Sequence, residues 1–182
     1  PKVRQPSWSR YYSGTSETRD RELSYALDVG LEVLGGGMTS RLYQSLVEDQ
    51  QIAINANTYA WTTLHDEGPA IITASPAPGV TLDVLETAIM AKVLEEGFTD
   101  AEVERARNSL AAQAIYARDS QSNMANTFGS TLALGGSIED VLDYPDAMRA
   151  ITTEQAIAAV REIFGADRHY IEAHLLPAEG DS

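Results

Sequence analysis

Three histidines are the side chains of this sequence best suited to hold a metal ion or carry a proton near neutral pH. They are His65, His169 and His174. None stands in a His-x-x-Glu-His or His-Glu-x-x-His helix, the spacings that place two imidazoles beside one zinc ion. His169 and His174 are an odd number of residues apart, so on one strand they point to opposite faces. Glu172 and His174 share a face but lack a third ligand, and the sequence predicts no metal site in this chain.

Two other polar segments suggest chemistry that their surroundings do not support. The cluster His65-Asp66-Glu67 reads as a solvated hairpin loop. The run Gly35–Gly37, followed by Thr39-Ser40 and Arg41, suggests a phosphate cradle. A P-loop requires a preceding strand and a Lys-Ser/Thr pair, and both are missing. The run therefore predicts a tight reversal between two helices, and a nucleotide-binding domain is disfavoured.

Nucleophilic catalysis finds no support in the sequence either. The chain has no cysteine, which excludes thiol catalysis, thiolate zinc sites and disulfides. It has no Gly-x-Ser-x-Gly elbow, the turn that exposes a catalytic serine. Taken residue by residue, the sequence predicts no catalytic group.

The length of the chain indicates the number of domains, and its charge limits the kinds of partner. The chain has 182 residues, with 13 basic and 27 acidic side chains and a net charge of −14. This length suits one domain that buries a sizeable core. Strong negative charge repels phosphate backbones and anionic lipid, so neither nucleic acid nor a membrane is expected as a partner. No apolar run approaches the length of a transmembrane helix.

Periodicity and capping signals place helices and strands in separate blocks. Two capping boxes, Thr99 with Glu102 and Thr152 with Gln155, mark helix starts. The expected strands are 8–13, 53–61, 69–75 and 168–175, the middle two as an antiparallel hairpin. The expected helices are 20–34, 41–50, 81–96, 99–119, 122–134, 138–144 with a second turn or helix near 146, and 152–164. The order predicts an α+β fold, a two-layer sandwich whose mainly antiparallel sheet carries helices on one face.

The segment Leu34–Ala53, LGGGMTSRLYQSLVEDQQIA, resembles a hallmark of the insulinase-type (M16) zinc metallopeptidases. It is similar to the segment near the start of their second, non-zinc domain. The likeness continues, in register, through shorter pieces that extend it over nearly the whole chain. These pieces are Pro78-Gly79, Glu95–Val103, Tyr116–Ser120 and Ile151–Ala156.

The resemblance implies a pair of homologous domains, each an antiparallel sheet backed by helices. One carries the inverted zinc motif His-x-x-Glu-His, and the other, without metal, closes over an unfolded peptide. Residues 1–182 are then expected to be a single C-terminal-type domain excised from a longer chain, inactive alone, that helps to enclose an extended peptide substrate. No cofactor is expected in this chain, and zinc is expected in the partner domain.

That partner is a homologous zinc-bearing domain, upstream in the same chain or in another subunit of a hetero- or homodimer. A bacterial protein, periplasmic or cytoplasmic, is the setting the resemblance suggests.

The sequence departs from the family at two positions. Second domains of the family carry an Arg and a Tyr, seven residues apart, that reach the substrate, and in this register Val47 and Ile54 replace them. Neither side chain donates a hydrogen bond. The departure fits the second half of a zinc-bearing chain that borrows those groups from a partner. It also fits a scaffold or interaction subunit of the same fold that has lost peptidase function.

Overall fold

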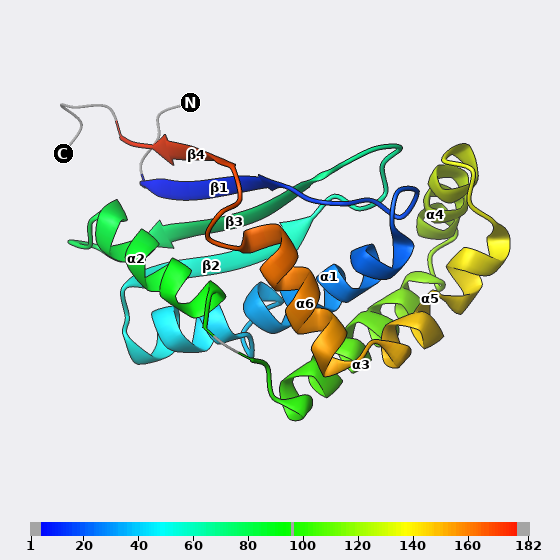
Figure 1. Cartoon of the computed structure of the whole chain (residues 1–182), viewed down its shortest axis with the longest axis horizontal. Coiled ribbons are helices and arrows are strands. Elements are labelled where there is room, and N and C mark those ends of the chain that lie inside the picture. Colours follow the sequence, from blue (N-terminus) through cyan, green and yellow to red (C-terminus); the bar gives the residue numbers. More distant parts are fainter. Residues whose placement is uncertain (1–4, 96, 178–182) are drawn as a thin grey trace.

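The computed structural model describes residues 5–95 and 97–177, which form one sheet and a layer of helices (Figure 1). The strands are β1 (Ser7–Ser13), β2 (Ala53–Ala60), β3 (Pro69–Pro76) and β4 (Tyr170–Leu175). The helices are α1 (Arg21–Gly35), η1 (Tyr43–Asp49), α2 (Leu82–Val93), α3 (Asp100–Ala117), α4 (Gln121–Ala133), α5 (Ile138–Ala150) and α6 (Thr153–Phe164). Among these helices, none combines the length and the apolar character that crossing a bilayer requires.

The sheet has the strand order β2-β3-β1-β4, and every neighbouring pair is antiparallel. The predicted hairpin is β2 and β3. The first and last strands of the sequence pair with each other, so β1 lies inside the sheet and β4 forms an edge. Helices α2 and α6 lie in front of the sheet in Figure 1, and both contact β1. The predicted α+β class, an antiparallel sheet with helices packed on one face, is confirmed.

Alternation along β1 points every second side chain at the helices. Trp8 and Tyr12 are buried on this side. They join a core that includes Leu27 and Leu34 of α1 and Phe164 of α6. The rings of Tyr12 and Phe164 meet edge to face with centroids 4.9 Å apart, a favoured geometry for aromatic pairs.

Capping chemistry fixes the helix starts where the sequence predicted. The boxes at Thr99 and Thr152 are both formed. Residues 138–150 differ from the prediction, because they form one continuous helix and not a short helix followed by a turn. Pro145 is buried inside that helix, where packing outweighs the loss of its N–H. Helix α2 ends at Val93, short of the predicted end at Glu96, which lies outside the described residues.

The glycine run reverses the chain between α1 and η1, as predicted. Gly35 is the last residue of α1, and the left-handed conformation belongs to Gly37, with φ of 110°. Arg41 does not face a free anion site, because its guanidinium donates to both carboxylate oxygens of Glu102 at 2.7 and 2.8 Å. This pairing helps to hold the pKa of Glu102 at about 2. A phosphate cradle is therefore not formed here.

Gly35 is required by the close approach of α1 to β2. A Cβ on Gly35 would lie 2.3 Å from the backbone nitrogen of Thr58. We expect Gly35→Ala to destabilise the fold by about 1–3 kcal/mol, because the backbone of the β2–β3 hairpin has to shift. Gly129→Ala is the matched control, since a Cβ at this position in α4 meets no atom within 4 Å. The control should be stabilised by about 0.5–1 kcal/mol. Urea unfolding of both variants measures this, and equal midpoints would contradict it.

Candidate functional site

The face of the sheet turned away from the helices carries a row of apolar side chains. Strand pairing aligns Tyr59 with Ile71, Ile71 with Tyr11, and Tyr11 with Ile171. These four residues, one from each strand, are called the apolar row below. Ile71 is only 2% exposed although it lies outside the main core, whereas Ile171 is 73% exposed. Ile71 is therefore shielded from solvent, and the exposed members of the row, Tyr11, Tyr59 and Ile171, offer both aromatic and aliphatic surface to a ligand.

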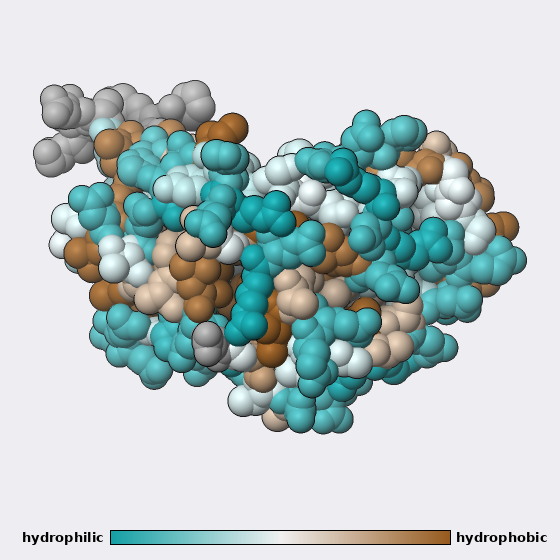
Figure 2. Space-filling model, viewed as in Figure 1, coloured by the Kyte–Doolittle hydropathy of each residue, from teal (hydrophilic) through white to brown (hydrophobic). Residues whose placement is uncertain are grey.

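A shallow hollow of about 360 Å³ adjoins the apolar row at the β1–β4 end. Its lining includes Tyr11 and Ile171 of the row, together with Pro69 and His169. Such a hollow with a few polar groups at its rim suits an apolar side chain of an extended ligand. The helix side has a different surface. Its hydrophobic residues are scattered among hydrophilic ones, with no single patch at one end (Figure 2).

Val47 and Ile54 lie on adjacent elements. Val47 is on η1, partly buried against the core, and Ile54 is about half exposed beside an irregularity in the β2–β3 pairing. Helix η1 contacts β2 directly. The two positions are thus close to the sheet edge but present only aliphatic groups. Their predicted role as substrate-contact positions stays a prediction.

The histidines are dispersed. His65 lies in the exposed β2–β3 loop, with its Nδ1 3.7 Å from Asp66. His169 precedes β4, and His174 lies within β4, opposite Trp8 on the helix side of the sheet. The sequence spacing therefore correctly predicted that His169 and His174 do not lie together. None of the three belongs to a pair of imidazoles that resembles the family's helical zinc motif.

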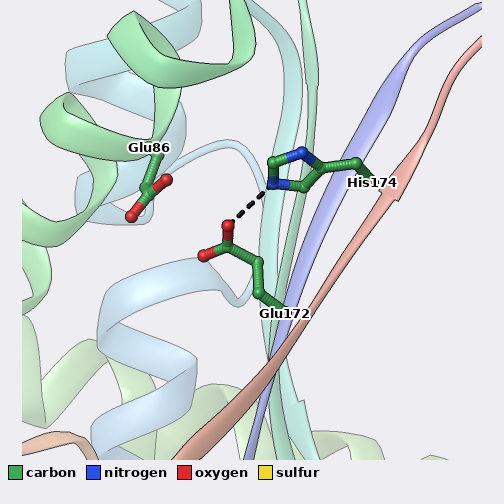
Figure 3. A group of neighbouring side chains, drawn as sticks. All are labelled: Glu86, Glu172 and His174. Carbon is green, nitrogen blue, oxygen red and sulfur yellow. Dashed lines mark hydrogen bonds and ion pairs between the residues drawn. The ribbon is translucent and has the colours of Figure 1, made fainter.

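A polar cluster that sequence spacing did not reveal lies between β4 and α2. Glu86 of α2 converges with Glu172 and His174 (Figure 3), and one ligand atom from each lies within 4.8 Å of the others. His174 Nε2 is 2.7 Å from Glu172 Oε1. The sequence does place Glu172 and His174 on one face of a strand, because they are two residues apart. Nothing local marked Glu86.

Arg10 is buried beneath this cluster. Its Nε donates to Glu172 Oε2 at 3.0 Å, its Nη2 pairs with both carboxylates, and its guanidinium lies 3.9 Å from the ring centroid of Tyr170. Burial alone would raise the pKa of Glu172, but hydrogen bonds from Arg10 and His174 outweigh it and lower that pKa. The carboxylate is therefore held ionised and oriented.

A second cavity, of about 300 Å³, lies on the helix side and is acidic. Its wall includes Asp28 and Glu17 beside the rings of Tyr25 and Tyr144, whose centroids are 5.3 Å apart. Burial, together with the nearby Glu17 charge, raises the pKa of Asp28 to about 7. A carboxyl group of this kind costs folding free energy whenever it ionises.

Comparison with known proteins identifies what the fold resembles. The family model described as the peptidase M16 inactive domain matches residues 1–110. Among curated proteins, an uncharacterized zinc protease of Mycobacterium leprae is 32% identical over 150 residues, which is 80% of this chain and 33% of the relative. The chain spans about a third of the length of the curated relatives it matches.

Solved structures share the same fold. A protease from Helicobacter pylori superposes with a TM-score of 0.83 at 22% identity, covering 96% of this chain and 42% of the other. The peptidase M16 inactive domain from Pseudomonas fluorescens gives a TM-score of 0.81 at 19% identity, covering 98% of this chain and 42% of the other. At these identities the likeness is one of fold.

Proposed function

Since the chain belongs to the peptidase M16 inactive-domain family, we propose that it is a non-catalytic domain that encloses and binds an extended peptide beside a zinc-bearing homologous domain. The zinc ion and the bond cleavage belong to that partner domain. The present chain contributes surface. The family's name for this domain, together with the curated zinc proteases among its relatives, supports the division of labour.

The observation that carries the proposal is the apolar row on the open sheet face. Tyr11, Tyr59 and Ile171 are 37%, 42% and 73% exposed, and no helix among the described residues packs over them. Aromatic side chains supply large, rigid contact area at low cost in conformational entropy. An extended peptide that crosses the sheet meets the exposed side chains of Tyr59, Tyr11 and Ile171, with the hollow beside Tyr11 and Ile171 as a side-chain pocket.

The replaced positions determine how the peptide is held. Val47 and Ile54 cannot donate hydrogen bonds to a peptide carbonyl or to the oxyanion of a tetrahedral intermediate. We therefore assign to this domain apolar contacts with the substrate and to the partner the polar groups that act on the scissile bond.

Peptide binding and cleavage test the proposal together. The chain alone should hydrolyse no fluorogenic casein-derived peptide, with or without added zinc, while the zinc-bearing domain and this chain together should cleave it. A peptide carrying a photoactivatable phenylalanine should crosslink to the open face. Tyr11→Ala should weaken peptide binding about 5-fold, the effect of losing about 1 kcal/mol of contact energy.

Tyr116→Ala is the control, because Tyr116 is also a solvent-exposed tyrosine, 73% exposed against 37% for Tyr11, but lies on α3 in the helix layer. It should leave peptide affinity unchanged. If both tyrosine variants bind peptide as the unaltered chain does, the open face is not the binding surface. Absence of any peptide binding, with stable association between the two domains, would favour the scaffold role instead.

A further inference from the structure

We propose that Glu86, Glu172 and His174 form a binding site for one divalent cation of the zinc class, independent of the peptide-enclosing function. The three side chains come from α2 and from the edge strand β4, and their polar ends turn toward one space (Figure 3). One nitrogen and two carboxylate oxygens are a donor set that zinc accepts, with water completing the tetrahedron.

Arg10 makes this arrangement a prepared site. It bonds to Oε1 of Glu86 and to Oε2 of Glu172. The remaining oxygen of Glu172, Oε1, faces His174 Nε2, and the second oxygen of Glu86 has no bond to a described residue. Glu86 therefore keeps one oxygen for a metal ion while Arg10 fixes the other, and the bond between Glu172 Oε1 and His174 Nε2 would be replaced by bonds from both atoms to the ion. Metal-binding carboxylates commonly have such an outer hydrogen bond, which orients them.

The cluster keeps a net negative charge, which attracts a cation even though Arg10 is present. Two carboxylates and one arginine give a net charge of −1 when His174 is neutral. A divalent ion on the side of the carboxylates away from Arg10 compensates this charge. The fully buried Trp8 adds to the case, because its Nε1–H has no complete hydrogen bond among the described residues, yet it lies near enough to Glu172 to help lower the pKa of that carboxyl. A donor in this place orients the carboxylate or a metal-bound water.

The distances require only side-chain adjustment. Ligand atoms around zinc, at bond lengths of about 2.0–2.2 Å, lie about 3.4 Å apart in a tetrahedron. The pair His174–Glu172, at 2.7 Å, already approaches this spacing, and all three atoms are within 4.8 Å. The side chains of Glu86 and His174 are 30% and 39% exposed. They are therefore free to change rotamer and close on an ion.

The ion would tie the edge strand to the helix layer. Strand β4 is paired on one side only, with β1, and most of its residues are exposed. A cation shared by β4 and α2 crosslinks the last strand of the sheet to a helix that is about 80 positions earlier in the chain. Its effect is structural, because Arg10 fills the inner side of the cluster and no described side chain stands ready as a general base toward a peptide.

Zinc titration of the metal-stripped chain tests the site. Calorimetry with zinc chloride should give one equivalent bound, whereas magnesium chloride should give none, because magnesium prefers oxygen ligands and retains its waters. His174→Ala should weaken zinc binding at least 10-fold. His65→Ala is the control, since His65 also lies beside a carboxylate, 3.7 Å from Asp66, but in an exposed loop. It should bind zinc as the unaltered chain does.

A second variant distinguishes loss of the metal site from a folding defect. Glu86→Gln removes one ligand but leaves the Arg10–Glu172 ion pair, and zinc should raise the melting temperature of the unaltered chain but not of this variant. The proposal is overturned if the unaltered chain takes up no zinc, or if His174→Ala binds it undiminished. Neither readout involves peptide, so failure here leaves the proposed peptide binding untouched.

Discussion

Arg10→Met is expected to destabilise the domain by about 2–4 kcal/mol, because it leaves two partly buried carboxylates without their counter-ion. Arg10 is 5% exposed, pairs with Glu86 and Glu172, and is stacked against Tyr170. Methionine keeps the apolar stem but removes the charge. The partial exposure of both carboxylates, which water can reach, limits the penalty. Urea unfolding at pH 7 measures the difference.

Two controls separate the buried pair from charge in general. Arg21→Met removes an ion pair of similar length, 2.6 Å to Asp140, but its side chain is 46% exposed, and the expected loss is below about 1 kcal/mol. Lowering the pH to 4 should shrink the Arg10→Met deficit, because the orphaned carboxylates then protonate. Equal losses for the two arginine variants, or a deficit that does not change with pH, would show that Arg10 acts only through its apolar contacts.

Asp28→Asn is expected to stabilise the domain at pH 8, by an amount on the order of 2–4 kcal/mol. The pKa of Asp28 is raised to about 7, mainly by burial and then by the charge of Glu17. Between the ordinary aspartate pKa and this value, the folded state holds a proton that the unfolded state has released. Stability therefore falls as pH rises from about 4 to about 7 and stays low above it. Asparagine has the same shape and cannot ionise, which removes this loss.

The groups around Asp28 support the expectation that its ionisation lowers the stability of the folded state. Across the cavity lie Tyr144 and Arg118, and Glu17 lies on the segment before α1. Arg118 donates an N–H from its Nη2 to the carbonyl of Leu142 at 2.7 Å, and its charge is not among the causes that shift the pKa of Asp28. Burial also raises the pKa of Glu17, which adds to the same downward slope of stability with pH.

Thermal melts from pH 4 to pH 8 test the Asp28 prediction. The unaltered chain should lose stability across this range, and the variant should lose less. Asp143→Asn, at an exposed position of α5, should follow the unaltered chain at every pH. If Asp28→Asn and Asp143→Asn give the same profile, the Asp28 carboxyl is solvated in solution and the acidic cavity is open.

Local signals predicted most of the elements, because the interactions behind them join residues three or four apart. The capping boxes at Thr99 and Thr152 fixed two helix starts. Alternation between turn residues predicted the β2–β3 hairpin. The same local reasoning missed that 138–150 form one continuous helix, in which Pro145 is buried. The helix predicted at 41–50 is present, but its main part, η1, has a wider π-helical turn that has no sequence signature.

The sequence by itself determined the family, the α+β class and the order of the elements, since these depend on a contiguous motif and on short-range periodicity. Only the tertiary structure decided which distant side chains meet. Glu86 reaches Glu172 because α2 packs over β1 and β4 pairs with β1. The apolar row exists because three strand registers align Tyr59, Ile71, Tyr11 and Ile171. Register and layer packing are set by burial of the whole core, and no window of the sequence contains that information.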